Sequence, residues 1–263
     1  MKNEYYYLIR ISYLGFRYSG WQKQPGTKTV EGMVLKTLKF ILPDRKFKIL
    51  ASGRTDAKVS SLDGAFELFM KDGPLGDLTQ FMEEFNKNLP TDIKAININE
   101  VNEKFNIIKD ATIKEYTYFF SCGSKCHPFC APFMVSFPEV LNIELMKEGA
   151  TLFKGTHDFS VYTSRDTKSS NLVRTIEDCF IEENTLLKAN FFPEKTYVLR
   201  IRGKGFLRYQ VRMVMGALIQ LGMGELNLED IHRSLKPSSK MQISRVAPGS
   251  GLMLHSLDFH LAG

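Results

Sequence analysis

The sequence contains no run of the roughly 18 to 20 consecutive apolar residues that a membrane-spanning helix needs. Its first residues, MKNEYYYLIRIS, lack the basic segment followed by an apolar segment that marks a secretion signal. These two absences predict a soluble, cytoplasmic protein that has no membrane partner. A low-complexity tract or linker is also absent, so composition alone does not separate one part of the chain from another.

Cysteine is scarce, with four residues in 263. Cys122, Cys126 and Cys130 recur at four-residue intervals, with His127 among them, but the paired spacings typical of a zinc site are absent. Pro128 also interrupts any helix that would align the thiols on one face. We therefore predict reduced cysteines and no metal, with a cysteine metal site as the alternative.

The chain is rich enough in apolar residues, 43% of 263, to bury a full core in one large domain or two small ones. Its formal net charge is +6. A modest positive excess suggests a polyanionic partner such as nucleic acid, and a generic basic enzyme is the alternative from charge alone.

Strand-like and helix-like segments alternate along the chain. Aromatic and β-branched alternation predicts strands at 5–15, 47–52, 64–70, 114–121, 171–183 and 196–203. Apolar spacings of three and four predict helices at 29–42, 76–90, 142–153 and from Gly205 to about Leu221. Because several strands follow one another without a helix between them, we predict an α+β fold with two similar units, 1–104 and 105–263, and mostly antiparallel sheets.

A basic stretch lies in the second half of the chain. From residue 195 to 224 there is no acid, and the basic residues are Lys195, Arg200, Arg202, Lys204, Arg208 and Arg212. The helix predicted to begin after "GKG" would present free backbone N–H groups to a phosphate. A merely solvated basic face is the alternative, because the two look alike in sequence.

The stretch "ASGRTDAKVSSLDG" is predicted to be an unusually long connection, with thirteen residues from Ser52 to Gly64 between two strands. Arg54 and Asp56 are two residues apart, so in an extended segment their side chains can pair. A neighbouring guanidinium keeps a carboxylate ionised, which suits a nucleophile. The alternative is an Asx-turn carboxylate that is satisfied by a neighbour.

Several motifs in one order resemble the tRNA pseudouridine synthase A family, from about residue 5 to 259. They are "GRTDA", "YLGFRYSGWQKQPGTKTVEGMVLKTL", "NKNLPTDI", "ATIKEYTYFF", "GTHDFSVYT", "GKGFLRYQVRMVMGAL" and "APGSGLMLHSLDF". The resemblance implies two α/β units joined across a central basic RNA-binding cleft, and an isomerase without a cofactor. Such enzymes detach uracil from its ribose, turn it and rejoin it through carbon 5.

The resemblance also implies roles for single residues. Asp56 is expected to be the catalytic carboxylate, with Arg54 beside it to hold it ionised and displace the target nucleotide. Tyr116 is expected to stack on the base near the carbon 5 proton. Arg212 is expected to pair with Asp56 or to contact a phosphate. The expected RNA-binding residues are Trp21, Lys58, Arg200, Arg202, Lys204 and Arg208.

Two departures from the family pattern stand out. Lys58, Val59 and Ser60 follow "GRTDA", where the family has Gly-Val-His. Residues 105–108 read Phe-Asn-Ile-Ile, where the family has Phe-His-Ala-Arg. The candidate catalytic residues are retained, while residues expected to face the RNA differ. This suggests a divergent member of the family with a changed target.

Three hypotheses therefore stand at this point. The first is an RNA pseudouridine synthase acting on tRNA, with ribosomal or another structured RNA as a possible substrate. The second is a catalytically weak RNA-binding relative, and the third is the cysteine metal protein. From the resemblance we also expect a homodimer.

Overall fold

The computed structural model describes residues 4–164, 171–237 and 239–260. Its contacts divide the chain into two compact units, Met1–Thr112 with Leu254–Gly263, and Ile113–Met253. The last strand therefore returns to the first unit, whereas the sequence places it with the second half. The domain boundary between residues 104 and 105 stays a prediction.

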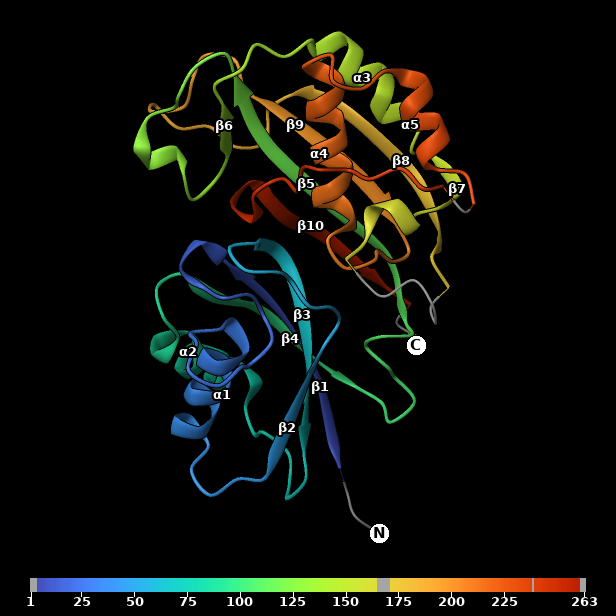
Figure 1. Cartoon of the computed structure of the whole chain (residues 1–263). Helices are drawn as coiled ribbons and strands as arrows, with labels where there is room; N and C mark the ends of the chain where they lie inside the picture. Colours follow the sequence, from blue (N-terminus) through green and yellow to red (C-terminus); the bar gives the residue numbers. More distant parts are fainter. Residues whose placement is uncertain (1–3, 165–170, 238, 261–263) are drawn as a thin grey trace. The chain divides into compact units, whose positions relative to one another are not determined.

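The first unit is built on a sheet with the strand order β4-β1-β3-β10, in which β2 also pairs with β3 (Figure 1). Its strands and helices are β1 (Tyr5–Tyr13), α1 (Val30–Ile41), β2 (Phe47–Ala51), β3 (Ser60–Met70), α2 (Leu78–Asn88), β4 (Ile93–Val101) and β10 (Leu252–Phe259). Strand β1 pairs antiparallel with β3 and β4, and β2 pairs antiparallel with β3. A short 3-10 turn, η1 (Gly15–Arg17), follows β1.

Both helices of the first unit pack on one face of this sheet. Val34 and Leu38 of α1 and Phe85 of α2 are in one buried cluster with Ile9 of β1 and Phe66 of β3. Thr29 caps α1 through a hydrogen bond from the Gly32 amide, as the sequence predicts. Apolar spacing at three and four residues thus becomes a buried stripe.

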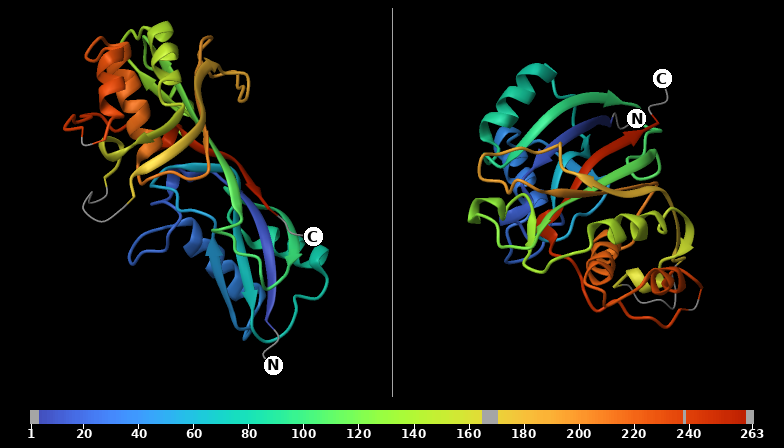
Figure 2. Two further views of the ribbon diagram at one scale, coloured as in Figure 1. Left: turned by 90° about the vertical axis from the view of Figure 1, so that its right-hand side faces the viewer. Right: turned by 90° about the horizontal axis from the view of Figure 1, so that it is seen from above.

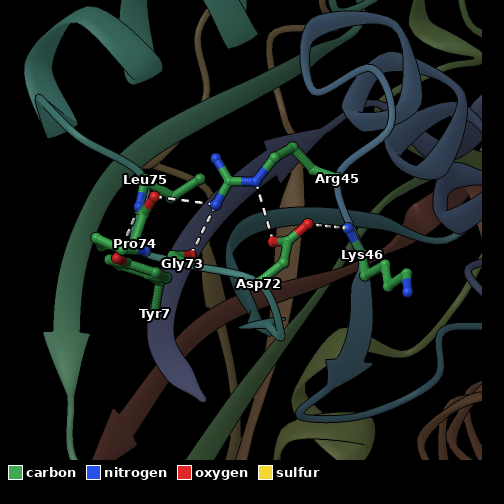
Figure 3. Close-up of polar contacts among 7 residues, drawn as sticks. All are labelled: Tyr7, Arg45, Lys46, Asp72, Gly73, Pro74 and Leu75. Atoms are coloured by element: carbon green, nitrogen blue, oxygen red, sulfur yellow. Dashed lines mark hydrogen bonds and ion pairs between the residues drawn. The ribbon is translucent and has the colours of Figure 1, made fainter. Parts of the chain in front are cut away.

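The connection between β3 and α2 is held by Arg45 and Asp72 (Figure 3). The Arg45 guanidinium donates to the Asp72 carboxylate at 3.0 Å and to the Gly73 carbonyl at 2.7 Å. The Asp72 carboxylate also accepts from the Lys46 amide at 2.8 Å. This amide bond and then the Arg45 bond lower the pKa of Asp72. The turn beside the start of β2 is therefore fixed by charge-assisted hydrogen bonds.

The second unit has the strand order β5-β9-β8-β7, with β6 paired to β5. Its elements are β5 (Ala111–Cys122), η2 (Pro128–Cys130), β6 (Val135–Phe137), α3 (Ile143–Thr151), β7 (Gly155–Asp158), η3 (Ser160–Tyr162), β8 (Val173–Glu183), β9 (Tyr197–Gly203), α4 (Gln210–Gly222), α5 (Leu228–Ser234) and η4 (Gly249–Gly251). The pairs β5–β9, β7–β8 and β8–β9 are antiparallel, and β5–β6 is parallel.

Helices α3, α4 and α5 gather on one side of the strands of this unit, as both views of Figure 2 also show. Gly149 of α3 lies so close to α4 that an added Cβ would be 2.2 Å from Leu221. The apolar spacing that predicts this helix is confirmed within α4, where Val211, Val214, Leu218 and Leu221 are all buried, and Leu207 is buried just before the helix begins.

The predicted α+β class with mostly antiparallel pairing is confirmed. Two predicted boundaries are wrong. Strand β3 begins at Ser60, so the connection before it ends at Val59 and is shorter than predicted. Helix α4 begins at Gln210, not at Gly205, because Tyr209 has left-handed backbone angles (φ 65°, ψ 0°) that end helical geometry there. The "GKG" segment therefore does not begin a helix, and the predicted phosphate site at a helix start after this segment is wrong.

In the part of the chain that the structure describes, no helix is long and apolar enough to cross a membrane.

Candidate active site

Asp56 lies in the connection between β2 and β3, in the first unit. The side chain is partly buried, and a turn begins at this residue, since the Val59 amide donates to the Asp56 carbonyl at 3.2 Å. Strand β2 ends at Ala51 and β3 begins at Ser60, so the loop that carries Asp56 is anchored in the sheet at both ends. The sheet therefore limits where the carboxylate can move.

The segment after β1 holds this loop from the other side. The Thr55 carbonyl accepts from the Trp21 amide at 3.1 Å, and the Thr55 hydroxyl shares a 2.8 Å hydrogen bond with the Tyr13 hydroxyl. The Lys58 amide donates to the Tyr18 carbonyl at 3.0 Å. Bonds on both sides of Asp56 thus fix its backbone.

Two glycines let these segments approach so closely. A Cβ on Gly15 would lie 1.9 Å from the Val59 carbonyl oxygen, and one on Gly20 would lie 2.6 Å from the Thr55 carbonyl oxygen. Gly20 also has a φ of +97°, which favours glycine. The motif Tyr-x-Gly and the Gly-Trp-Gln element therefore position the Asp56 loop.

Asp92 holds the segment after β1 through hydrogen bonds to Arg17 and Tyr18. Its carboxylate accepts from the Tyr18 hydroxyl at 2.7 Å and from Arg17 at 2.6 Å. Burial works against ionisation, but these two hydrogen bonds leave the pKa of Asp92 lower than usual. Tyr18 thereby links Asp92 to the backbone of Lys58.

Arg54 is exposed, and within the described ranges it has no hydrogen bond or ion pair. The sequence predicts an ion pair between Arg54 and Asp56. That intraloop ion pair is therefore not formed. Arg54 presents its guanidinium to solvent.

Trp21 is a core residue and not a surface one. Only 4% of it is exposed, and its ring packs against Tyr13 and Phe66 at centroid distances of 5.9 and 6.2 Å. No ring face is left for a base to stack on. Its prediction as an RNA-binding residue is corrected: its backbone positions the Asp56 loop.

Tyr116 lies on β5 of the second unit, opposite Ile201 of β9. It is partly buried, and its ring meets Phe206 edge to face at a centroid distance of 5.2 Å. Phe206 belongs to the "GKGFL" segment that follows β9. The tyrosine ring is therefore oriented by an aromatic neighbour rather than enclosed in the core.

Arg200 is not the unpaired cation that the acid-free stretch suggests. Its guanidinium donates to Glu115 at 2.7 Å and to Glu182 at 3.3 Å, from the strands on either side of β9. Burial opposes its charge, but these carboxylates raise the pKa of Arg200. A stretch without acids in the sequence can still lie beside acids from other strands. Arg200 is therefore fixed between Glu115 of β5 and Glu182 of β8.

The remaining basic residues of the stretch are more accessible. Lys204 and Arg208 are exposed, and the Arg202 side chain is 48% exposed with Glu177 at 4.0 Å. The Arg208 and Arg212 guanidinium carbons lie 5.1 and 4.8 Å from the centre of the Tyr209 ring. The structure therefore brings these two arginines together around one aromatic ring.

The cysteines form no disulfide. Cys126 lies 2.8 Å from the Ser121 hydroxyl, and the buried Cys130 thiol donates to the Phe191 carbonyl at 3.3 Å. Among the described residues, no group of three or more His, Cys, Asp or Glu side chains could hold a metal ion. The alternative of a cysteine metal protein therefore has no support here.

Comparison with known proteins gives full-length similarity. The profile of the family described as tRNA pseudouridine synthase matches residues 150–260. The chain is 32% identical over 258 residues to "tRNA pseudouridine synthase A" of Thermodesulfovibrio yellowstonii, covering 95% of this chain and 97% of the relative. It is 30% identical to "tRNA pseudouridine synthase A 2" of Bacillus cereus, over 96% and 99% of the two chains.

The chain belongs to the tRNA pseudouridine synthase A family. The "GRTDA" motif around Asp56 lies outside the region that the family profile matches, residues 150–260. Asp56 and Arg54 are in the first unit, and Tyr116 and Arg212 are in the second.

Lys58, at the position where the resemblance implies a glycine, lies within the turn closed by the Val59 amide and the Asp56 carbonyl. Lys58 keeps a left-handed φ of 66°, the conformation that glycine adopts freely. Its ammonium lies 5.6 Å from the centre of the Phe16 ring. A non-glycine residue in this conformation costs on the order of 1 kcal/mol.

Residues 105–108, where the resemblance implies Phe-His-Ala-Arg, contribute apolar packing in this structure. Ile107 is fully buried in a small cluster with Leu8 and Leu257, and Phe105 packs edge to face on Phe259. Ile108 is exposed, so its side chain lies outside this cluster. The segment therefore adds to the apolar packing of the first unit.

Sequence reasoning missed the residues that hold the site. Thr55, Tyr18 and Asp92 act through hydrogen bonds to the Asp56 loop or its neighbour, and none of them has a distinctive local pattern. The only available signal was their presence inside the quoted motifs "GRTDA", "FRYSG" and "LPTDI".

Proposed function

We propose that this protein is an RNA pseudouridine synthase that isomerises uridine to pseudouridine in tRNA, with the anticodon stem-loop as its target. The observation that carries the proposal is full-length similarity to tRNA pseudouridine synthase A at 32% identity. The closely held Asp56 loop supports it, because a nucleophilic carboxylate must be fixed near the reacting atom.

In the proposed reaction Asp56 attacks the sugar or the base of a flipped uridine and forms a covalent intermediate. The glycosidic bond breaks, the uracil turns, and carbon 5 bonds to carbon 1 of the ribose; the bond to Asp56 breaks, so that the carboxylate is released. The carbon 5 proton passes to water, and nitrogen 1 takes up a proton in its place. Tyr116 stacks on the base near the carbon 5 proton. Arg54 helps to displace the nucleotide, and Arg212 pairs with Asp56 or with a phosphate. No cofactor takes part.

The proposed RNA-binding residues are those whose charge reaches solvent: Lys58, Arg202, Lys204 and Arg208. Their cationic groups would contact backbone phosphates, a contribution that weakens as salt increases. Arg200 orders strands β5, β8 and β9 through Glu115 and Glu182.

A second target RNA is favoured by a specific observation. Ile108 stands where the family has an RNA-binding arginine, and Lys58 adds a charge beside the catalytic loop. A different phosphate pattern would suit these changes, so ribosomal or another structured RNA is the second candidate substrate. A relative that binds RNA but turns over weakly is the third.

From the family we also propose a cytoplasmic homodimer, with the two domains 1–104 and 105–263. Light scattering of the purified protein would test the dimer. A mass near 30.1 kDa at micromolar concentration would contradict it.

The central experiment measures tritium released from RNA labelled at carbon 5 of uridine. Wild type is expected to release tritium from tRNA, and Asp56→Asn none, because an amide cannot act as the nucleophile. Asp44→Asn, which alters an exposed aspartate of the same unit, serves as the matched control and should act like wild type. Equal release by wild type and Asp56→Asn would refute the assignment of Asp56.

The RNA target requires a separate measurement. Pseudouridines are mapped by sequencing RNA from cells with and without the gene. Loss of a tRNA anticodon-arm pseudouridine is expected. Loss of a ribosomal RNA pseudouridine instead would support the second candidate.

A further inference from the structure

The segment from Ser244 to Pro248 has no regular secondary structure, but it is bonded to α4 around Arg212. The Ala247 amide donates to the Arg212 carbonyl at 3.0 Å. The Arg212 Nε donates in return to the Ala247 carbonyl at 2.7 Å. One residue of the segment thus contacts both the backbone and the guanidinium of Arg212.

Further contacts fix the start of this segment. A Cβ on Gly216 would lie 1.9 Å from the Arg245 carbonyl oxygen, so only glycine lets the segment lie on α4 at this distance. The Arg245 guanidinium donates to Glu139 at 3.2 Å, and Gln220 donates to the Ser244 hydroxyl at 3.0 Å. Glu139 and the α4 residue Gln220 therefore both hold the start of this segment.

The residue after Ala247 is anchored by Tyr118 of β5. The Tyr118 hydroxyl donates to the Pro248 carbonyl at 2.8 Å. Tyr118 is fully buried, and a Cβ on Gly251 would lie 2.8 Å from its ring. Burial raises the pKa of the Tyr118 phenol, so the hydroxyl stays protonated and remains a donor.

We propose that Tyr118 is a positioning residue for Arg212. Its hydroxyl fixes Pro248, Pro248 fixes the Ala247 carbonyl, and that carbonyl accepts from the Arg212 Nε and directs the guanidinium, which also lies against the Tyr209 ring. The functional part rests on the proposed role of Arg212 in catalysis. The geometric part, that the Tyr118 hydroxyl sets the Arg212 side chain, stands without it.

The test compares Tyr118→Phe with Tyr162→Phe. Both tyrosines are fully buried in the second unit, and the Tyr162 hydroxyl shares its hydrogen bond with Ser234 at 2.6 Å, away from the segment at Ala247. Each variant loses one buried hydroxyl and keeps its ring. We expect kcat to fall about tenfold in Tyr118→Phe with KM unchanged, and to stay at the wild-type value in Tyr162→Phe.

Two further measurements separate this inference from the proposed function. In a background of Arg212→Lys, adding Tyr118→Phe should cause no further loss of kcat, whereas additive losses would overturn the inference. The Arg212 Nε–H resonance, followed by nitrogen-labelled NMR, should shift and exchange faster with water in Tyr118→Phe only. An unchanged resonance overturns the inference whatever the activity, while an inactive wild type with a shifted resonance refutes only the proposed function.

Discussion

The loop around Asp56 and the segment around Ala247 both lack regular secondary structure, but they are held in different ways. The Asp56 loop is held mainly by backbone hydrogen bonds to Tyr18 and Trp21, fewer than 45 residues earlier in the chain. The Ala247 segment is held mainly by side chains, among them a tyrosine 130 residues away from its partner. A loop fixed by backbone depends on its glycines, and a loop fixed by side chains depends on single polar atoms.

Both regions share one requirement, close approach at a glycine. Gly15 and Gly216 each place a carbonyl oxygen 1.9 Å from where a Cβ would be. This common distance makes the two regions directly comparable. It also provides the strongest way to disturb each of them.

The largest expected effect is that of Gly15→Ala and Gly216→Ala. Each added methyl group must push a backbone carbonyl away, so each should lower the free energy of unfolding by about 1–3 kcal/mol. Urea denaturation measures this. Gly205→Ala is the control, because a Cβ there meets nothing within 4 Å. A Gly15 variant as stable as the control would contradict the close packing of the Asp56 loop.

Thr55→Val should have a smaller effect that is centred on catalysis. It keeps the shape of the side chain but removes the hydrogen bond to Tyr13, so about 1 kcal/mol of stability is lost and the Asp56 loop loosens. We expect kcat to fall severalfold. Thr37→Val, a buried threonine of α1 with a 3.4 Å bond, is the control for turnover. Unchanged kcat in Thr55→Val would show that side chains do not help to hold this loop.

The third prediction separates Arg200 and Arg208, two arginines of the basic stretch from residue 195 to 224. Arg208→Gln should weaken RNA binding severalfold and reduce the slope of log affinity against log salt by about one, because one phosphate contact is lost. Arg200→Gln should lower stability and leave that slope unchanged, since Glu115 already neutralises the arginine. RNA titrations at several salt concentrations test both. Equal slopes for the two variants would contradict this division.

The smallest effect is expected for Lys58→Gly beside the Asp56 loop. Glycine adopts a φ of 66° without strain, so the variant should gain up to about 1 kcal/mol of stability. The same change removes a cation and should reduce RNA affinity. Thermal unfolding measures the expected gain in stability, and RNA titration measures the expected loss of affinity. A loss of stability would mean that the Lys58 contact with Phe16 outweighs the strain.

Several features were predictable from residues that are close in sequence. Thr29 and the spacing of Val30, Val34 and Leu38 predict α1 and its cap, because both depend on neighbours within one or two turns. The predicted start of α4 was wrong because a single residue before it has an unusual backbone conformation. Tyr209, at φ 65°, delays α4 by five positions, and no local pattern marks a left-handed tyrosine.

The candidate site residues also differ in how much the sequence alone reveals about them. Asp56 and Tyr116 are candidates because they lie in contiguous motifs that resemble those of a family, and their catalytic roles stay predictions. Trp21 belongs to such a motif too, but its ring is buried against Tyr13 and Phe66, which the motif alone does not reveal. The charge of Arg200 looked available because its own stretch holds no acid, while its partners lie on other strands.

The sequence by itself determined the family, the α+β class and the candidate catalytic residues, because periodicity and contiguous motifs are local properties of the chain. Only the tertiary structure decided which cations are already paired, which aromatic ring is buried and what holds Arg212. The physical reason is sequence distance. Glu115 meets Arg200 across 85 residues and Tyr118 meets Pro248 across 130, and such pairings exist only once the strands are assembled.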